Sequence, residues 1–492
     1  MDNQFEMVAK TFAGLEGVLA EELRALGATN IQAGRRMVSF EGDLATLYKA
    51  NLSCRTALRI LKPFYKFKAR DPERLYEMVK EFDWGSMLSI DKTFAIDTVT
   101  NSDEFSHSRF VTYKVKDAIV DWFKDRYGED KRPGVRLVDA DVMINVHING
   151  TNVTLSLDSS GESLHKRGYR VAQTEAPINE VLAAGIILLS GWRGDCPLVD
   201  PMCGSGTFLI EAALIAANIN PGIYRRGFAF ERWKDFDADL FDRLYNDDSG
   251  EREVNFKIFG ADISPKAIKI ASENIKSAGV GKYIDLQCRA ISTWTEAPQP
   301  AGVMVTNPPY GERISAPDMD ALYQTIGSKL KHVFTGYHAW IIGYRDEYFA
   351  RIGLAPSQKL PLYNGALECS LREYVIFEGD RKSFVRAGGK IGNGPAERAK
   401  SDSRDERKSR RPGERKGRFN ERADDDRYTE RTKGRRFDDR AANAPIQEAD
   451  PENPLAKRRN PHALKMLVGK QPSLKPQEGP IMRSRGWKKK SE

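Results

Sequence analysis

Four consecutive residues, Asn307, Pro308, Pro309 and Tyr310, follow directly after the short apolar run 302–306. Proline fixes its own backbone angle and has no N–H to donate, so two adjacent prolines hold the neighbouring polar groups rigid. An asparagine side chain and a proline carbonyl offer hydrogen-bond acceptors, and tyrosine offers a flat ring. The motif therefore fits a rigid polar site at the end of a strand. The plain structural alternative is a strand that ends in a turn.

A glycine-containing turn follows a second apolar strand at 197–199, where Gly204 and Gly206 precede a helix rich in Ala, Leu and Ile. Glycines let the backbone approach a ligand closely, and a helix N-terminus offers unpaired N–H groups. No lysine follows the glycines, which excludes a Walker A loop, and Leu209 occupies the third glycine position of the dinucleotide fingerprint. Asp200 at the strand end would repel a pyrophosphate but suits a cationic ligand. A G-x-G turn alone is weak support for a binding site.

A second acid, Asp262, ends the strand predicted at 257–264. At this position a carboxylate can accept hydrogen bonds from both hydroxyls of a ribose. Asp262 and Ser264 also precede a predicted helix whose first turn contains Pro265, so capping of that helix is the structural alternative. The two roles are compatible.

These residues require a sheet that brings strand ends together. From about residue 171 onward helices alternate with buried strands, which is typical of a doubly wound parallel sheet. Residues 1–160 contain shorter strands and amphipathic helices, with alternating apolar residues at 141–160 that indicate a sheet with one solvent-facing side. The sequence thus predicts two small α+β units before one larger α/β unit.

Four segments in this order and spacing resemble a known family: "LHKRGYR" (164–170), "EAPINEVLAA" (175–184), "LVDPMCGSGTFLIEAA" (198–213) and "NPPYGER" (307–313). They are similar to the THUMP-containing class I S-adenosylmethionine-dependent rRNA guanine-N2 methyltransferases, in particular to the methyltransferase half of the bacterial 23S rRNA enzyme. The resemblance extends from about residue 5 to residue 378.

The resemblance implies a ferredoxin-like α+β unit at 1–65, a THUMP RNA-binding domain at 66–162 and a Rossmann-like methyltransferase domain at 163–380. It also implies S-adenosylmethionine as cofactor, with the methionine part near Asp200 and the glycine turn, and the ribose at Asp262. The implied cofactor-binding residues are Pro177, Asn179, Asp200, Pro201, Met202, Cys203, Gly204, Ser205, Gly206, Asp262, Ile263, Ala290 and Asn307. Pro177 and Asn179 equally suit the start of a helix.

One position departs from the family pattern. Family members usually have an acid after the third strand of the sheet, which binds the adenine amine, and this chain has Ala290 there. We therefore expect adenine recognition to depend on backbone groups or on a shifted residue.

The implied chemistry is methylation of an exocyclic amine. The lone pair of a guanine N2 amine is conjugated with the ring, so the nitrogen is a poor nucleophile until it becomes pyramidal. By analogy with such sites, the Asn307 oxygen and the Pro308 carbonyl would accept hydrogen bonds from the two N–H groups of the amine. Pro309 would fix the geometry, and Tyr310 would stack on a flipped base. Positioning and electrostatics can then provide most of the rate without a dedicated base.

Several other reactive residue types fit structural roles better. Cys203 could suggest the nucleophile of a pyrimidine methyltransferase, but a thiol is unnecessary beside an amine-directed motif. His147 and His338 have no partner at metal-ligand spacing, so we expect no metal site. The segment "HKRGYR" (165–170) could contact RNA or be a solvated basic linker.

Composition places the positive charge at one end of the chain. The 492 residues contain five scattered cysteines without a C-x-x-C pair, no signal-like start and no apolar stretch of membrane-spanning length, so we expect a cytoplasmic protein that does not bind membranes. Residues 380–492 contain 32 Lys and Arg against 18 Asp and Glu, which leaves 45 against 51 for residues 1–379. The mixed charges at 381–492 predict a disordered basic tail that either binds RNA or only aids solubility.

The sequence leaves several functions open. The expected partner is 23S rRNA or a large-subunit assembly intermediate, bound by a monomer. The alternatives are a tRNA guanine-N2 methyltransferase, a non-catalytic RNA-binding assembly factor on the same scaffold, and a DNA adenine-N6 methyltransferase. Saturable binding of S-adenosylmethionine would separate an enzyme from the non-catalytic factor.

The tail hypothesis gives a first prediction. Deleting residues 385–492 should weaken RNA binding and flatten its dependence on salt, because fewer counterions are released, while binding of S-adenosylmethionine stays intact. Titrations of RNA at several salt concentrations measure the slope. An unchanged slope would reject a role for the tail in RNA binding.

Overall fold

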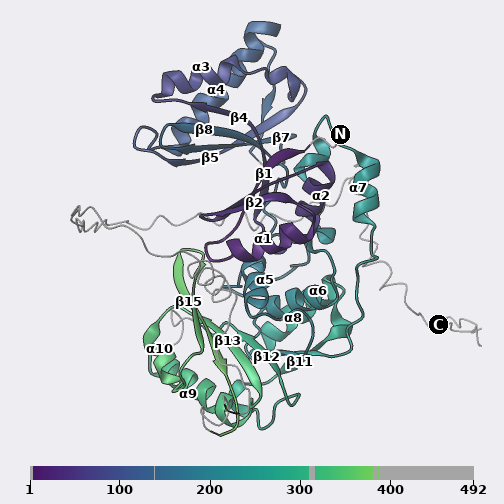
Figure 1. The fold of residues 1–492 in the computed structure, drawn as a ribbon, viewed down its shortest axis with the longest axis vertical. Coiled ribbons are helices and arrows are strands. Elements are labelled where there is room, and N and C mark those ends of the chain that lie inside the picture. The colour runs from purple at the N-terminus through teal and green to yellow at the C-terminus, as the bar shows by residue number, and fades with distance from the viewer. Residues whose placement is uncertain (1–3, 138, 310–315, 380–385, 387–492) are drawn as a thin grey trace, which may run out of the picture.

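The computed structural model describes residues 4–137, 139–309, 316–379 and 386. Three units follow one another along the longest axis of the molecule, with the ferredoxin-like unit in the middle (Figure 1). Apart from residue 386, the predicted basic tail lies outside the described residues.

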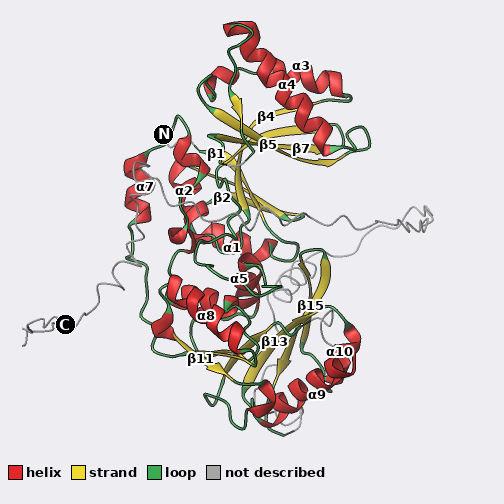
Figure 2. Cartoon of the chain, turned by 180° about the vertical axis from the view of Figure 1, so that it is seen from behind, coloured by secondary structure: helices red, strands yellow, loops and turns green. Residues whose placement is uncertain are grey.

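The first two units share a single eight-stranded sheet in the order β2-β3-β1-β4-β8-β7-β5-β6. The first unit consists of β1 (Phe5–Lys10), α1 (Glu16–Ala25), β2 (Thr29–Gly34), β3 (Met37–Gly42), α2 (Leu44–Ser53) and β4 (Arg59–Lys68). The second unit adds α3 (Pro72–Glu81), β5 (Thr93–Asn101), α4 (Ser108–Tyr127), β6 (Gly134–Val135), β7 (Val142–Asn149) and β8 (Asn152–Asp158). Helices α3 and α4 cover one face of its strands (Figure 2), and alternate residues of β7 are buried as the sequence predicted.

Strand β4 joins the two units, and the sequence analysis did not predict it. Its first residues pair with β1, and residues from Leu61 onward pair with β8. Pro63, a residue that weighs against a strand, lies where the register shifts between Pro63 and Tyr65, so a bulge accommodates the missing N–H. The boundary proposed at residue 65 thus lies inside a shared strand.

The third unit contains a seven-stranded sheet in the order β11-β10-β9-β12-β13-β15-β14. Its elements are α5 (Glu180–Leu189), β9 (Leu198–Asp200), α6 (Thr207–Ala216), α7 (Ala238–Tyr245), β10 (Ile258–Asp262), α8 (Pro265–Ser277), β11 (Ile284–Cys288), β12 (Gly302–Thr306), α9 (Ala316–His332), β13 (Tyr337–Gly343), α10 (Asp346–Arg351), β14 (Gln358–Asn364) and β15 (Leu367–Val375). Strands β11, β10, β9, β12 and β13 are parallel, and the β14–β15 hairpin adds antiparallel strands. The predicted α/β fold with two preceding α+β units is confirmed.

The first unit packs directly on the third unit. A side chain added at Gly185 of α5 would come within 2.5 Å of Leu15, just before α1. A side chain at Gly14 would meet Leu362 of β14 at 2.8 Å. Both glycines therefore permit close contact between the two units.

The segment 221–245 between α6 and β10, here called the bridging segment, contacts both N-terminal units. Phe230 stacks on Tyr48 of α2 with ring centroids 4.5 Å apart. Arg232 donates to Asp139 and to the Ala140 carbonyl, both at 2.9 Å, and Lys234 donates to the Gly85 carbonyl at 2.8 Å. The bridging segment thus ties the second unit to the third.

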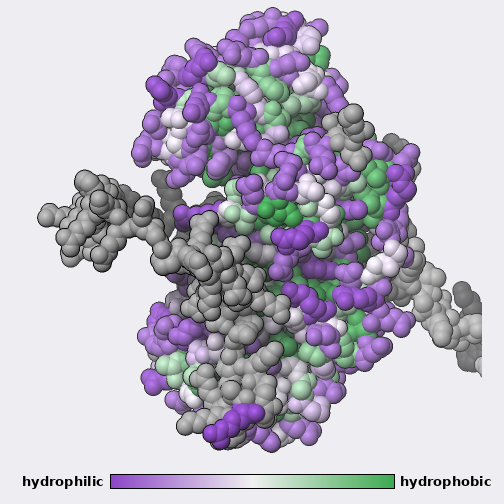
Figure 3. Space-filling model, in the orientation of Figure 1, coloured by the Kyte–Doolittle hydropathy of each residue, from purple (hydrophilic) through white to green (hydrophobic). Residues whose placement is uncertain are grey.

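The face seen in the space-filling view is largely hydrophilic, with hydrophobic patches on the upper unit and around the middle of the molecule (Figure 3). Across the described ranges, no helix combines the length and the apolar character needed to cross a bilayer.

Candidate active site

Two buried side chains join the ends of neighbouring strands. Thr306, the last residue of β12, donates from its hydroxyl to Asp200 Oδ1 at 2.8 Å, and Asp200 is the last residue of β9. Both side chains are buried. Since β9 and β12 are parallel neighbours, the residues that follow them, Pro201 and Asn307, leave the sheet at the same edge.

The glycine turn is held against the next strand. The backbone N–H of Cys203 donates to the Ala261 carbonyl at 2.8 Å, and that of Gly204 donates to Asp262 Oδ2 at 3.0 Å. Gly204 and Gly206 have φ of 52° and 82°, where other residues are strained. The turn thus depends on both glycines.

The two glycines face different surroundings. A side chain at Gly206 would approach Ala271 of α8 to 3.2 Å, so this glycine serves helix packing. At Gly204 the nearest atom would be Thr174 Oγ1 at 4.0 Å, so the space beside this backbone is open. A ligand can approach the chain at Gly204.

Asp262 anchors the turn and does not cap the helix itself. Its Oδ1 accepts from Ser264 N–H at 2.9 Å, while Ser264 is the N-cap of α8 and accepts from Ala267 N–H at 3.3 Å. The capping alternative for Asp262 is therefore wrong, and Ser264 has that role. The neighbouring Ile263 is 73% exposed, an apolar side chain presented at the carboxyl-end edge of the sheet.

Asn179 caps α5, the alternative left open for it. Its side-chain oxygen accepts from Val181 N–H at 2.9 Å and from Leu182 N–H at 3.4 Å. Pro177 precedes this cap and is half-buried. A capping residue can still lie beside a pocket, so cofactor contact at both positions stays a prediction.

Arg170 connects the start of α5 with the glycine turn, and sequence reasoning missed this role. Its guanidinium donates to Glu180 at 2.6 Å, to Ser205 Oγ at 3.0 Å, to Thr207 Oγ1 at 2.9 Å and to the Ile178 carbonyl at 3.2 Å. Four hydrogen bonds from one planar group fix the relative positions of these two segments.

Asn274 of α8 makes a second connection that the sequence did not reveal. Its side-chain oxygen accepts from Val171 N–H at 2.9 Å and Ala172 N–H at 3.1 Å, and its amide donates to the carbonyls of Ala172 at 2.9 Å and Ser205 at 3.1 Å. Asn274 lies on the buried side of α8 with Ile270. A polar residue in such an apolar stripe must find partners, and this was an available signal.

Both interpretations of "HKRGYR" are wrong for its last residues. Arg167 is buried and forms an ion pair with the buried Glu211, with Nε and Oε1 3.4 Å apart. Tyr169 is also buried and donates to Glu211 at 2.9 Å. Arg167 and Tyr169 therefore belong to the interior and Arg170 is half-buried, whereas Lys166 is exposed.

The surroundings of the Asp200 carboxyl group change its pKa. Burial raises the pKa of Asp200 to about 7, and the nearby Asp262 charge acts in the same direction. Hydrogen bonds from Thr306 and from Met202 N–H lower this pKa and offset part of the shift. A cation beside Asp200 would favour its ionised form.

The thiol and the imidazoles have structural surroundings. Burial raises the pKa of Cys203 well above its ordinary value, so it stays protonated and unreactive. His338 pairs with Glu373 at 2.9 Å, and His147 is half-buried in β7. Within the part of the chain that the structure describes, no three His, Cys, Asp or Glu side chains gather as metal ligands.

The proline motif begins at the expected edge. Asn307 is half-buried, Pro308 is buried and Pro309 is exposed. Tyr310, the predicted stacking residue, lies outside the described residues. Ala290 follows β11 and its carbonyl accepts from the Thr293 hydroxyl at 2.8 Å, so this carbonyl is already engaged.

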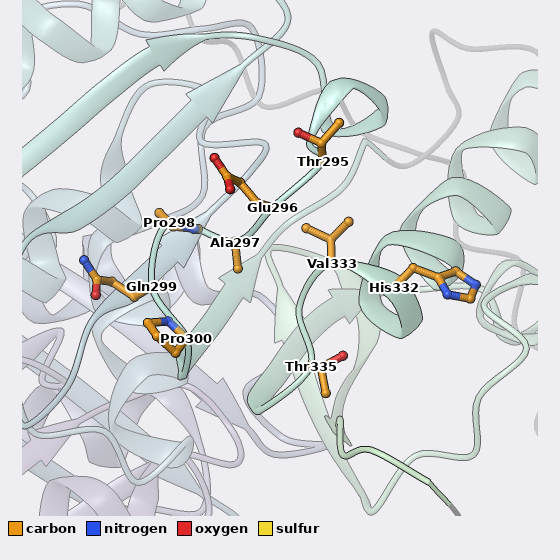
Figure 4. Close-up of a pocket in the computed structure, with 9 residues that line it drawn as sticks. All are labelled: Thr295, Glu296, Ala297, Pro298, Gln299, Pro300, His332, Val333 and Thr335. Atoms are coloured by element: carbon orange, nitrogen blue, oxygen red, sulfur yellow. The ribbon is translucent and has the colours of Figure 1, made fainter.

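A shallow cavity of about 410 Å³ lies elsewhere, between residues 295–300 and 332–335 (Figure 4). These residues precede β12 and β13, at the amino ends of the strands. The cavity is therefore on the opposite edge from the glycine turn and does not belong to the candidate site.

Comparisons with known proteins agree with this architecture. Residues 6–61 match the RlmL ferredoxin-like domain, residues 69–158 the THUMP domain, and residues 167–373 the RMKL-like methyltransferase domain. A Synechocystis protein described as a candidate RNA methyltransferase is 39% identical over 367 residues, which cover 74% of this chain and 95% of that protein. The chain belongs to the THUMP-containing RMKL-like methyltransferases.

Longer relatives and solved structures give the same family. A ribosomal RNA large subunit methyltransferase K/L of Syntrophotalea carbinolica is 40% identical over 391 residues, 77% of this chain and 54% of that protein. The chain therefore spans about half the length of these enzymes. A crystal structure of a candidate methyltransferase with S-adenosylhomocysteine has a TM-score of 0.69 and 32% identity, covering 77% of this chain and all of that one. A candidate methylase from Clostridium difficile 630 has a TM-score of 0.70 and 32% identity over the same shares.

The predicted family and cofactor are thus confirmed: RMKL-like methyltransferases depend on S-adenosylmethionine. The residues present here fit that group. The open space at Gly204 admits a ligand close to the backbone, Asp262 stands beside it, and Ile263 offers an exposed apolar surface for a flat ring.

The four bonds of Arg170 give a prediction for cofactor binding. Arg170→Met should raise the Kd for S-adenosylmethionine at least about tenfold, because the two segments that it connects lose their fixed spacing. Isothermal titration calorimetry measures this Kd.

Arg225→Met provides the matched control. Arg225 is another half-buried arginine, and it donates to the carbonyls of Ser160, Glu162, Ser163 and Lys166, away from the glycine turn. Both variants should lose roughly 2–4 kcal/mol of unfolding free energy, since several charge-assisted hydrogen bonds of a half-buried guanidinium disappear. Equal weakening of cofactor binding in both would contradict the role of Arg170.

The raised pKa of Asp200 predicts a pH dependence. Its ionised form favours a cationic ligand, so affinity for S-adenosylmethionine should rise between pH 6 and pH 8, through the pKa of about 7. The ligand-free fold responds in the opposite direction, because the proton held in the folded state makes stability fall as pH rises from 3.8 toward 7.

Asp200→Asn keeps an acceptor for Thr306 and removes the charge. The variant should bind S-adenosylmethionine more weakly at pH 8, with a flatter pH profile, and should be no less stable than the wild type at that pH. Calorimetric titrations and thermal unfolding at pH 6, 7 and 8 test both parts. A wild-type affinity that does not change with pH would refute the prediction.

Proposed function

We propose that this protein transfers the methyl group of S-adenosylmethionine to the exocyclic N2 amine of a guanine in large-subunit ribosomal RNA. It would act as a monomer in the cytoplasm, on 23S rRNA or on an assembly intermediate. The hydrogen bond between Thr306 and Asp200 is the observation that carries the proposal. It joins the strand before the proline motif to the strand before the glycine turn, so the amine site and the cofactor site share one edge.

Cofactor binding would use residues from three strand ends. The turn from Met202 to Gly206 would surround the methionine part, Asp262 would accept from the ribose hydroxyls, and Ile263 would pack on the adenine. Once bound, S-adenosylmethionine supplies a methyl group made electrophilic by the positive sulfur. With Ala290 in place of an acid and its carbonyl engaged by Thr293, adenine contacts would come from other backbone groups or from a shifted residue.

The amine would be held by the rigid motif. The Asn307 oxygen and the Pro308 carbonyl would accept hydrogen bonds from its two N–H groups. This arrangement favours a pyramidal nitrogen and directs its lone pair at the methyl group of S-adenosylmethionine. Both acceptors also stabilise the positive charge that grows on nitrogen, and the product amine releases one proton to solvent. Tyr310 would stack on the flipped base.

The RNA assignment is supported by the THUMP match and by the relatives. Two of those relatives are named for ribosomal RNA of the large subunit, while a solved structure at 31% identity, from Listeria monocytogenes, is named as a predicted N6-adenine-specific DNA methylase. Adenine N6 is also an exocyclic amine, so the motif alone does not choose between the bases. The THUMP domain favours RNA.

Mass spectrometry of nucleosides tests the substrate. Ribosomal RNA from cells lacking this protein should lose one N2-methylguanosine, and the purified enzyme should restore it. A loss confined to tRNA, or methylated adenine in DNA, would replace the proposed substrate. Absence of saturable S-adenosylmethionine binding would identify a non-catalytic RNA-binding protein.

Asn307 provides the test of mechanism. Asn307→Ala should lower methyl transfer by about 10²-fold or more, because an acceptor that aligns the amine is lost, while the Kd for S-adenosylmethionine changes little. Asn246→Ala, which removes the same group from the exposed end of α7, serves as control. Transfer that survives in Asn307→Ala would refute the assigned role.

A further inference from the structure

We propose that Tyr344 and Arg345 bind the RNA strand next to the methylated base. This inference rests on the proposed function and adds a substrate-binding site to it. The two residues follow β13, the parallel neighbour of β12.

The strand register places them beside the proline motif. The last pair between β12 and β13 is Thr306 with Ile341. Pro309 and Tyr344 each come three residues after that pair, and neighbouring strands lie about 4.8 Å apart. Tyr344 and Arg345 therefore leave the sheet at the same edge as Pro309, on the side away from β9.

The side chains form a flat cationic surface. Arg345 Nε donates to the Tyr344 hydroxyl at 2.6 Å, and its guanidinium carbon lies 5.1 Å from the Tyr344 ring centroid and 5.9 Å from that of Tyr348. The Arg345 side chain is 48% exposed. A planar guanidinium held over aromatic rings keeps its remaining donors available to a partner.

The acidic groups nearby leave this surface available. Glu347 is 3.0 Å from Arg345, but its side chain is 64% exposed, and exposed pairs of this kind contribute little and exchange readily. Asp346 pairs with Arg372 instead. A phosphate could thus replace Glu347 as the partner of Arg345 without leaving a buried charge unpaired.

The adjoining hairpin extends the surface outward. Ser370 of β15 pairs with Gly343, the last residue of β13, so only the tip of the hairpin, residues 362–369, lies beyond the end of β13. Tyr363 pairs with Glu368, two residues from Ser370 and on the same face, and Tyr363 is 39% exposed. It adds an exposed aromatic ring further along the same edge.

RNA is the partner that this chemistry fits. A base flipped into the pocket leaves the phosphates and bases beside it exposed. A guanidinium matches phosphate geometry with two parallel hydrogen bonds, and aromatic rings stack on single-stranded bases. Residues 1–379 contain more acidic than basic residues, 51 against 45, so Arg345 is not one of many equivalent cations on a generally basic surface.

The experiment compares two exposed arginines of α10 and its start. Arg345→Ala should raise the Kd for an unmodified 23S rRNA fragment by about fivefold to tenfold. The fragment contains the guanine that the enzyme methylates. Arg345→Ala should also reduce the slope of log Kd against log salt by about one. Arg345→Lys should keep the slope and lose part of the affinity, because lysine lacks the planar fork. Fluorescence anisotropy over a salt series measures both quantities.

Arg351→Ala removes the same charge from an exposed arginine that pairs with Asp320, and it should leave Kd and slope unchanged. The Kd for S-adenosylmethionine should be that of the wild type in all three variants. A wild-type slope in Arg345→Ala, or an equal change in Arg351→Ala, would overturn the inference. A wild-type protein that binds no S-adenosylmethionine and methylates no RNA would instead refute the proposed function.

Discussion

A buried hydrogen bond between Thr306 and Asp200 is the constraint on which the site depends. Both residues end short parallel strands, and neither side chain reaches solvent. A buried hydroxyl and a buried carboxyl group are each costly without a partner, so each fixes the other. The hydrogen bond therefore also positions the residues that follow: the glycine turn after Asp200 and Asn307 after Thr306. Local chain stiffness from the prolines then acts on a motif whose starting point is already set.

The cofactor region is assembled from segments that are distant in sequence. Arg170 and Asn274 hold the stretch before α5, the glycine turn and α8 together through hydrogen bonds to six other residues. Each of the two is itself largely enclosed, so little water competes for these bonds. The glycine turn is therefore preorganised by the protein and need not be ordered by the ligand.

Sequence patterns predicted the strand ends well because those patterns are local. Buried apolar runs located β9, β10 and β12, and the acids and the proline motif that follow them mark the sheet edge. The patterns failed where a partner lies far along the chain. The arginines of "HKRGYR" have the composition of a solvated linker, yet Arg167 is buried against Glu211 and Arg170 is half-buried against Glu180, and only the fold brings those acids near.

Strand β4 was missed for a related reason. Its proline argues against a strand when the sequence is considered alone, and the bulge that accommodates Pro63 exists only once β8 is paired beside it. Tertiary pairing overrode the local preference. The consequence is large, because this strand makes one sheet out of two units that appear separate in sequence.

The bridging segment has a consequence for the whole molecule. It belongs to the third unit, yet its Arg232 and Lys234 form hydrogen bonds with the second unit. The eight-stranded sheet also joins the second unit to the first, which opposes bending between those two units. Two attachments at separate points remove the freedom to swing that a single linker would leave. The distance between the second unit and the strand ends of the candidate site is then fixed by the fold. A folded polynucleotide that contacted both would be selected by its dimensions, independently of its base sequence.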